Sequence, residues 1–202
     1  MPEMKTADLI AAFDLFIDTN YFDAPVNERI LNELRAASGV PAPVYGRTSG
    51  GSVDERVRKV ESLIPSAETL EFVRGRLVES MEGVARRFDI TLSECENPQF
   101  LRYRVGDFFV AHQDGNTGMI RLAQEDRKVS VSIFLNQHSA NSEQGTYGGG
   151  SLVFSNYRNE PQAQELRLEG QAGMFVAFRS ETTHEVTPVT HGERYAIVTW
   201  YK

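Results

Sequence analysis

The sequence predicts a mainly β fold with helices in its first half, of the sandwich, jelly-roll or barrel type. The second half contains several short runs rich in Val, Ile, Phe and Tyr, separated by Gly, Pro and Asn. The first half instead has apolar residues at helical spacing. With 202 residues, of which 41% are hydrophobic, the chain can bury one sizeable core, and we expect a single domain over 1–202.

Two helices are predicted in the first half. The first covers 23–37, where Asp23 is a candidate N-cap and Pro25 lies in the first turn. The second covers 66–88, where one stripe of apolar side chains indicates packing against a sheet. The residues of that stripe are Leu70, Val73, Leu77, Met81, Val84 and Phe88.

Strands and loops alternate in the second half. The predicted strands cover 99–111, 128–136, 150–155, 164–168, 172–179, 184–188 and 194–201. Three glycine-rich polar stretches, 41–56, 115–127 and 136–150, are predicted loops of the kind that act as lids or binding loops.

Charge and cysteine content narrow the class of protein. A net charge of −7 argues against a nucleic-acid-binding surface. No segment reaches the ~20 apolar residues of a membrane span, and a single cysteine, Cys95, excludes an intrachain disulfide. We therefore expect a soluble cytoplasmic protein without a membrane or nucleic-acid partner, while the oligomeric state stays open.

A first candidate site lies in the stretch AHQDG, at the end of a predicted strand. Residues i and i+2 of a strand share a face, so His112 and Asp114 can reach one metal ion. Such a pair also arises by chance, and a structural or surface histidine is the alternative. A third candidate ligand, His184, begins a strand in the C-terminal part.

The last predicted strand, RYAIVTWY, is apolar on both faces, which indicates that both are covered. A guanidinium there is costly unless an anion pairs with it. Arg194 therefore needs either an internal carboxylate or the carboxylate of a ligand. Two histidines and a carboxylate on a β scaffold are typical ligands of non-haem iron(II) oxygenases, although Zn or Mn would also bind.

Four sequence blocks carry a resemblance to a known family. The chain has RYRVGDFFVAHQD, RKVSVSIFLN, Gly149-Gly150-Ser151-Leu152 and GMFVAFRSETTHEVTPVTHGER followed by Trp200. In this order they resemble the catalytic domain of prolyl 4-hydroxylase-like Fe(II)/2-oxoglutarate dioxygenases, over about half of the chain. The resemblance implies a cupin-like double-stranded β-helix over 98–202, supported by helices and strands of 1–97.

The resemblance also implies roles for individual residues. His112, Asp114 and His184 are the expected iron ligands, and Arg194 is expected to pair with the distal carboxylate of 2-oxoglutarate. Three further expectations have structural alternatives, as core or surface residues. They are a cosubstrate hydrogen bond from Tyr103, a peptide contact by Arg127 and a pocket wall at Trp200.

One position departs from the family pattern. Phe134 stands where the family usually has a tyrosine, so a hydroxyl that often contacts the cosubstrate carboxylate is missing here. We expect Arg194, with Tyr103 or Ser130, to hold the cosubstrate instead. His138 and His191 fall in predicted loops, where solvated histidines are expected rather than ligand contacts.

The implied reaction is hydroxylation of a substrate C–H with release of succinate and CO₂. It requires Fe(II), 2-oxoglutarate and O₂, with ascorbate as a candidate stimulant. A prolyl residue in a protein or peptide is the expected substrate. A free amino acid or another small molecule is the alternative, and a non-redox metal-binding jelly roll is a third interpretation.

Overall fold

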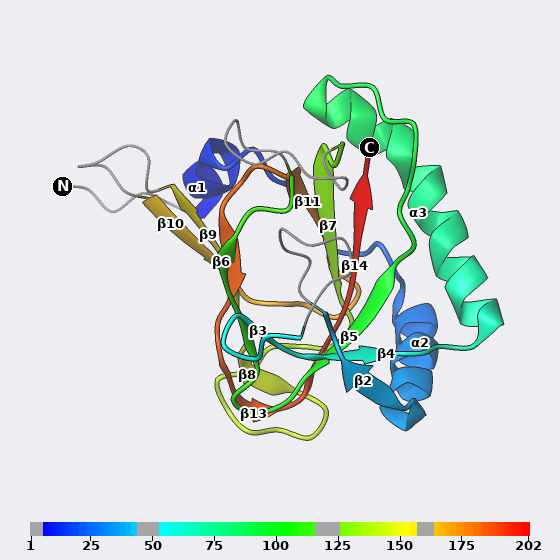
Figure 1. The fold of residues 1–202 in the computed structure, drawn as a ribbon, viewed down its shortest axis with the longest axis vertical. Helices are drawn as coiled ribbons and strands as arrows, with labels where there is room; N and C mark the ends of the chain where they lie inside the picture. Colours follow the sequence, from blue (N-terminus) through cyan, green and yellow to red (C-terminus); the bar gives the residue numbers. More distant parts are fainter. Residues whose placement is uncertain (1–5, 44–52, 116–125, 157–163) are drawn as a thin grey trace.

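Two antiparallel sheets packed against each other form the centre of the protein, seen in a computed structural model (Figure 1). The structure describes residues 6–43, 53–115, 126–156 and 164–202. Its three helices in this part of the chain are α1 Thr6–Ala12, α2 Ala24–Ala36 and α3 Ala67–Phe88. The described strands of the first half and the centre are β1 Phe16–Asp18, β2 Gly39–Pro41, β3 Arg58–Lys59, β4 Glu61–Leu63, β5 Gln99–Tyr103, β6 Phe108–His112 and β7 Val129–Phe134. Those of the C-terminal part are β8 Tyr147–Gly149, β9 Leu152–Asn156, β10 Gln164–Leu168, β11 Phe175–Arg179, β12 His184–Val186, β13 Val189–Gly192 and β14 Arg194–Tyr201.

The strand order is that of a jelly roll. The larger sheet has the order β1-β11-β7-β14-β5-β4-β2, and the smaller has β10-β9-β12-β6-β3. A two-stranded ribbon, β13-β8, lies at one end (Figure 1). This confirms the predicted mainly β, jelly-roll fold class.

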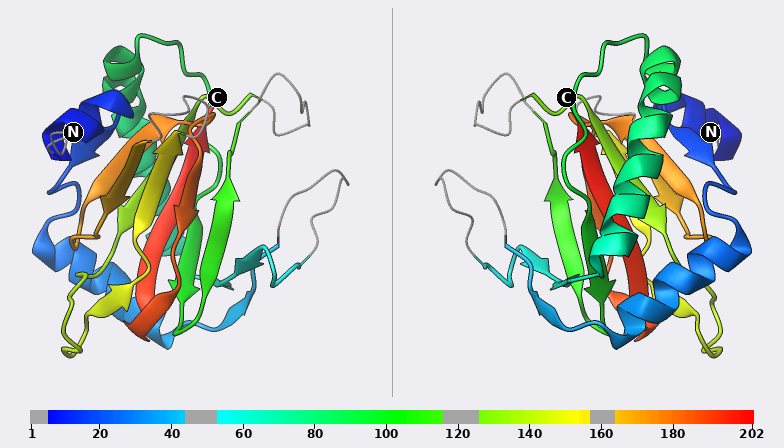
Figure 2. Two further views of the ribbon diagram at one scale, coloured as in Figure 1. Left: turned by 90° about the vertical axis from the view of Figure 1, so that its left-hand side faces the viewer. Right: turned by 90° about the vertical axis from the view of Figure 1, so that its right-hand side faces the viewer.

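Helices α2 and α3 cover the outer face of the larger sheet (Figure 2). Both begin as predicted: Asp23 accepts a hydrogen bond from the Val26 N–H, and Ser66 caps α3 through the Thr69 N–H. The predicted stripe of α3 packs on the sheet, with Val73 and Leu77 fully buried. The N-terminal helices therefore stiffen the sheet from outside and leave its inner face for the site.

Strand β14 is covered on both faces, as its sequence predicted. Tyr195, Ile197 and Tyr201 belong to the core beneath the helices. Arg194 and Trp200 alternate with these residues and are buried on the inner side, toward the smaller sheet.

The prediction of one strand over 99–111 was wrong. Strand β5 ends at Tyr103, and β6 begins at Phe108. In between, Gly106 adopts φ +83°, and the Asp107 carboxylate accepts a hydrogen bond from the Arg104 N–H at 2.8 Å. This turn moves the chain from the larger sheet to the smaller, so that the two halves of the predicted strand lie in different layers.

The ribbon β8–β13 was also missed. Tyr147–Gly149 was predicted as part of the loop 136–150, and β13 lies between the predicted strands 184–188 and 194–201. Helix α1 and the short strands β1 to β4 were not individually predicted either. The predicted loops 41–56 and 115–127 fall largely outside the described residues.

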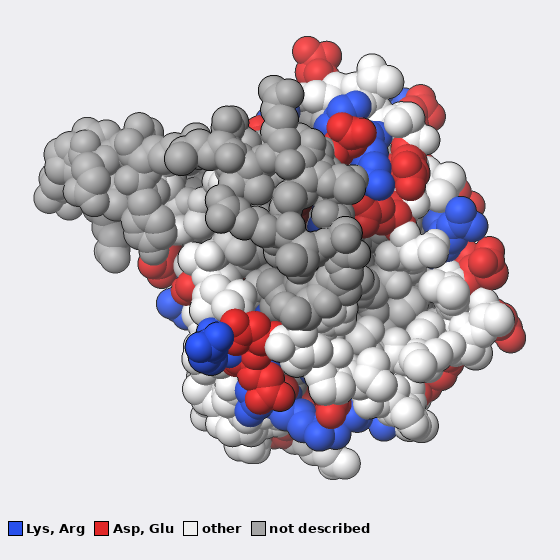
Figure 3. All heavy atoms as spheres, viewed as in Figure 1, with Lys and Arg blue, Asp and Glu red and all other residues white. Residues whose placement is uncertain are grey.

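Two further observations concern the surface. No helix in the described ranges is long and apolar enough to cross a membrane. On the face seen in Figure 3, acidic and basic side chains are intermixed around the edge rather than gathered by sign.

The glycines of α3 give a test of how this helix is stabilised. A Cβ at Gly75 would meet nothing within 4 Å, so Gly75→Ala is expected to stabilise the fold by about 0.5–1 kcal/mol. Urea denaturation measures the change. Gly173→Ala is the contrasting variant, because its Cβ would lie 2.3 Å from the Phe22 carbonyl oxygen at φ +81°; it should destabilise. A loss of stability in Gly75→Ala would contradict the open geometry.

Candidate metal centre

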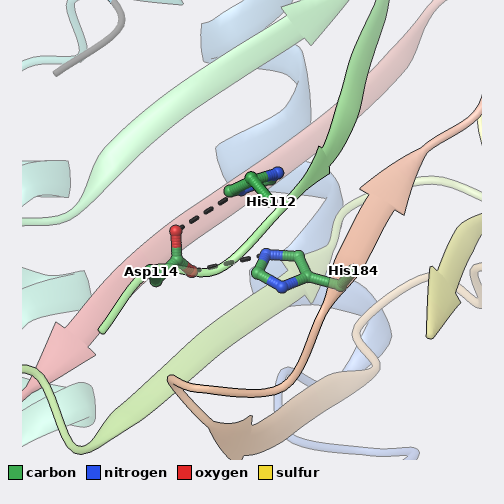
Figure 4. Close-up of side chains that lie close together, drawn as sticks. All are labelled: His112, Asp114 and His184. Atoms are coloured by element: carbon green, nitrogen blue, oxygen red, sulfur yellow. Dashed lines mark ion pairs between the residues drawn. The ribbon is translucent and has the colours of Figure 1, made fainter. Parts of the chain in front are cut away.

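Three side chains that could bind a metal converge at one point, from strands β6 and β12 and from the turn after β6. His112 ends β6 and His184 begins β12, and the two are direct partners across the antiparallel pair. Asp114 follows His112 by two residues, and its carboxylate faces both imidazoles (Figure 4). One ligand atom from each of the three residues lies within 4.8 Å of the others.

Both imidazoles are oriented by the backbone. His112 Nδ1 lies 2.8 Å from the Val110 carbonyl oxygen, and His184 Nδ1 lies 2.9 Å from that of Thr182. A carbonyl can only accept, so each Nδ1 carries the proton and donates it. Each Nε2 is therefore left with a free lone pair, and both face Asp114 at 3.4 Å.

The turn after β6 is fixed to the segment that precedes β12. The N–H groups of Asp114 and Gly115 both donate to the Ser180 carbonyl at 2.9 Å. Gln113 donates to the Glu181 carbonyl at 2.6 Å. A Cβ at Gly115 would lie 2.7 Å from the Arg127 carbonyl oxygen and 2.7 Å from Ser180 Cβ. The glycine of AHQDG is therefore required for this close approach.

Two buried serines hold the carboxylate of Asp114. Ser130, on β7, donates to Asp114 Oδ2 at 2.8 Å, and its hydroxyl lies 3.0 Å from that of Ser180. The link joins the carboxylate to the larger sheet, whereas both histidines belong to the smaller one. The ligand set is thus fixed from both sides of the fold.

A stack of side chains supports His112 from its other side. The Phe109 ring lies on the imidazole with centroids 3.7 Å apart and an interplanar angle of 19°. The guanidinium carbon of Arg58 lies 4.9 Å from the centre of the Phe109 ring. Phe109 therefore restricts the rotation of the imidazole.

Asp114 and His112 are held in the forms that bind a cation, whereas the pKa of His184 is shifted toward its protonated form. Burial alone would raise the pKa of Asp114, but the two imidazoles hold it well below its usual range. Burial and the neighbouring His184 lower the pKa of His112, which favours its neutral form. Burial also opposes the charged form of His184, but Asp114 outweighs it and raises the His184 pKa.

The donor set fits a ferrous ion. Two neutral imidazoles and one carboxylate are the facial triad of non-haem iron(II) sites, which leaves octahedral positions open. The geometry also accepts Zn²⁺ or Mn²⁺.

A second buried feature lies on the same inner face. Arg194 is 1% exposed, and its guanidinium carbon lies 5.0 Å from the Tyr103 ring centre and 4.9 Å from that of Phe134. Within the described part of the chain, its Nε has no hydrogen-bond partner and it forms no ion pair. Of the two anions that the sequence left open, an internal carboxylate is therefore not seen among these residues. A buried, unpaired cation fits a site for an anionic ligand.

Residues 98–202 match the family model of the 2OG-Fe(II) oxygenase superfamily. The chain belongs to this superfamily. Its enzymes use Fe(II), 2-oxoglutarate and O₂, and both the metal triad and the buried Arg194 fit that set.

Relatives point to the hydroxylase branch. A PKHD-type hydroxylase of Nitrosomonas eutropha is 30% identical over 81% of this chain and 70% of its own length. One from Shewanella sp. strain ANA-3 is 36% identical over 51% of this chain, which spans 41% of that relative. The chain is thus an oxygenase similar to PKHD-type hydroxylases, and it spans less than half the length of some of them.

Solved structures share the fold. A prolyl-4-hydroxylase of Pseudomonas putida superposes with a TM-score of 0.71 at 22% identity, over 98% of both chains. A prolyl hydroxylase of Trichoplax adhaerens, solved in complex with a hypoxia-inducible-factor oxygen degradation domain peptide, superposes with a TM-score of 0.67 at 16% identity. The superposition covers 97% of this chain and 86% of that one.

The remaining predicted residues lie as follows. Tyr103 pairs with Arg194 across β5 and β14. Arg127 makes two hydrogen bonds to Glu96, at 2.8 and 2.6 Å, and stacks 3.6 Å above the Trp200 ring. These contacts already satisfy the Arg127 guanidinium, so its role toward substrate stays a prediction.

Two histidines expected in solvent are partly buried. His138 lies 3.2 Å from a Glu169 oxygen, with its ring edge-on to Tyr147. His191 is part of β13, and its Nε2 lies 3.2 Å from the Asn141 carbonyl oxygen. Neither belongs to the metal triad.

Sequence reasoning missed the residues that support the ligands. Ser180 and Phe109 both lie within the quoted sequence blocks, Phe109 three residues before His112 and Ser180 four before His184, but no role was assigned to them. Their roles follow from strand pairing and from a turn, which the spacing alone does not report.

The Ser130 hydroxyl offers a direct test of the carboxylate support. Ser130→Ala is expected to weaken the affinity for Fe(II) or Mn(II) by ~10–100-fold, because Asp114 loses its orienting partner. Anaerobic metal titration measures it. Ser80→Ala, which removes a bonded hydroxyl on α3, should leave the metal affinity unchanged. Equal affinities in Ser130→Ala and the parent protein would contradict the support.

Metal binding is expected to weaken as pH falls. The imidazoles must be neutral to bind, and the Asp114 carboxylate raises the pKa of His184. As the pH falls, protons therefore begin to compete with the metal above the usual histidine pKa of about 6.5. The metal affinity should then fall by about tenfold per pH unit for each proton that the metal displaces. Metal titrations between about pH 8 and about pH 6, the range in which histidine titrates, measure this slope. A metal affinity that does not change over this range would contradict the prediction.

Proposed function

We propose that this chain is an Fe(II)- and 2-oxoglutarate-dependent hydroxylase whose substrate is a prolyl residue in a protein or peptide. The observation that supports it most is the pairing of a His-Asp-His cluster with a buried, unpaired guanidinium on one inner face. A non-redox metal-binding jelly roll has no need for that cation, which is costly without an anion.

The proposed roles follow the positions of the residues. His112, Asp114 and His184 hold the iron, and Arg194 with Tyr103 binds the distal end of the cosubstrate. When bound, the iron with 2-oxoglutarate and O₂ would supply the oxidising chemistry, in which one oxygen atom enters the substrate C–H bond and the other enters succinate as CO₂ leaves. The chain itself orients the ligands, neutralises the cosubstrate charge and keeps water from the inner face.

The inner face has a suitable order of side chains. On β7 it runs from Ser130, beside the metal triad, through Ser132 to Phe134, beside Arg194. Four residues of strand span ~13 Å. Opposite Ser132 and Phe134 on β14 lie Val198 and Ala196. In the proposed arrangement the cosubstrate chain lies past the small side chains of Ser132 and Ala196, between the two ends.

The choice of a peptide substrate rests on relatives. The Trichoplax structure contains a peptide, and the Pseudomonas protein is a prolyl-4-hydroxylase. Arg127 and Trp200 are the proposed substrate contacts, since the pair lies beside Ser130 at the metal end of the inner face. Hydroxylation of a free amino acid is the competing outcome of the test.

The experiment compares substrates directly. Purified protein is incubated with Fe(II), 2-oxoglutarate and O₂, and with proline-containing peptides or a panel of free amino acids. Mass spectrometry is expected to show a gain of one oxygen, about 16 Da, on a peptide, with matching succinate. Products on free amino acids alone would overturn the peptide assignment, and no succinate under any condition would overturn the activity.

His112→Ala tests the metal site. Loss of one of three ligands is expected to abolish Fe(II)-dependent succinate formation, with metal affinity reduced by at least ~100-fold. Anaerobic metal titration and succinate assays measure both effects. His191→Ala is the matched control, because the His191 ring lies outside the triad. It should keep the metal affinity and the succinate formation of the parent protein. Full turnover in His112→Ala would remove this residue from the iron.

Arg194→Ala tests the cosubstrate site. Loss of the charged pair is expected to raise the 2-oxoglutarate requirement by one or more orders of magnitude, while the metal affinity stays unchanged. Succinate formation at increasing 2-oxoglutarate gives the first value, and metal titration the second. An unchanged 2-oxoglutarate dependence would mean that Arg194 is only structural.

A further inference from the structure

The inner face lacks a hydroxyl at the position where related oxygenases are expected to have one. Phe134 lies beside the Arg194 guanidinium, with 4.9 Å between the guanidinium carbon and the ring centre, and a phenyl ring offers no hydrogen bond. A second donor to a carboxylate bound at Arg194 therefore has to come from another strand.

Tyr147, on the ribbon strand β8, is a buried tyrosine that no motif singled out. Its side chain is fully buried, and its hydroxyl has no hydrogen-bond partner among the residues that the structure describes. The register of β8 and β13 places Tyr147 opposite Gly192, two residues before Arg194. The ribbon that the sequence did not predict therefore brings this ring to the guanidinium.

Two glycines show how closely these side chains meet. A Cβ at Gly170 would lie 2.2 Å from Phe134 Cδ1 and 2.4 Å from the Tyr147 hydroxyl oxygen. A Cβ at Gly150 would lie 2.9 Å from Arg194 Cδ and 3.3 Å from Tyr147 Cε2. Phe134, Arg194 and Tyr147 thus share one small region, and their side chains can come this close because both positions lack a side chain.

The polar groups of this region are donors without acceptors. Burial raises the pKa of Tyr147, and the nearby Arg194 guanidinium and Gly170 N–H act in the opposite direction, so both donors lie near the hydroxyl oxygen. The hydroxyl proton itself has no acceptor within the described ranges, and neither does Arg194 Nε. A buried polar group without a partner is costly, and one carboxylate has enough lone pairs to accept from both.

We propose that the Tyr147 hydroxyl donates a hydrogen bond to the distal carboxylate of 2-oxoglutarate, together with Arg194, in place of the hydroxyl that Phe134 lacks. This rests on the proposed function, since it assigns a further residue to the same cosubstrate. It moves the second donor from strand β7 to the ribbon β8–β13, so that ordering of the ribbon and binding of the cosubstrate are coupled.

Tyr147→Phe is the direct test, because it removes only the hydroxyl, whose proton has no acceptor among the described residues. Protein loaded with Mn(II) or Fe(II) is titrated without O₂ with 2-oxoglutarate, by calorimetry and by the charge-transfer absorption of the Fe(II) complex. The expected result is a ~10–100-fold weaker affinity, the usual scale for a hydrogen bond to a charged group. The affinity for 2-oxopentanoate, which has the same chain without the distal carboxylate, should change less than about twofold.

Matched variants separate the possible failures. Tyr195→Phe makes the same change beside Arg194 but on the helix face, where the hydroxyl donates to Glu193; it should leave 2-oxoglutarate affinity unchanged. An unchanged Mn(II) affinity and a thermal midpoint no lower than that of the parent show that Tyr147→Phe is folded.

Three outcomes would overturn the proposal. Equal 2-oxoglutarate affinity in Tyr147→Phe and the parent, with Arg194→Ala weakened, removes Tyr147 alone and leaves the proposed function standing. Equal weakening for 2-oxopentanoate means that the hydroxyl does not act on the distal carboxylate. No binding of 2-oxoglutarate by the metal-loaded parent protein removes the proposed function and this inference together.

Discussion

The metal centre depends on one antiparallel pairing, between β6 and β12. Because His112 and His184 are direct partners, their side chains leave the sheet on the same side, at the ~4.5–5.5 Å spacing of opposed Cβ atoms. A shift of the register by one residue would send one imidazole to the other face. The contacts of Gln113, Asp114 and Gly115 with residues 180–183 fix this register at the end where the ligands lie.

The larger sheet separates stability from chemistry. Along β7, Val129, Val131 and Ile133 pack beneath the helices, and the alternate residues face the interior. One of these, Ser130, holds a metal ligand, and another, Phe134, borders the guanidinium. Rigid support from α2 and α3 on one face thus keeps the other face in a fixed arrangement, as a site with defined ligand positions requires.

The sequence reveals what depends on local spacing and on motifs. Periodicity predicted α3 and the two faces of β14. The motifs predicted His112, Asp114 and His184 as metal ligands, and the structure brings these three side chains together; it also buries Arg194, the predicted cosubstrate contact. The break at Gly106 was missed because apolar residues continue on both sides of it. Tyr147 was missed for a different reason: its value comes from a pairing with β13, more than forty residues away, which no local pattern reports.

Charge balance gives a reason why a dicarboxylic acid should be the cosubstrate. Under the proposed function, neutral imidazoles, a ferrous ion, one carboxylate from Asp114 and one guanidinium from Arg194 together carry two positive charges. 2-Oxoglutarate carries two negative charges, so the loaded interior is neutral. A monocarboxylic 2-oxo acid would leave Arg194 buried and unpaired, at a cost of several kcal/mol, on the order of that for a buried ion without its partner. The hydroxyl of Tyr147 adds direction to this selectivity, because a neutral donor strengthens binding of the distal carboxylate without altering the charge balance.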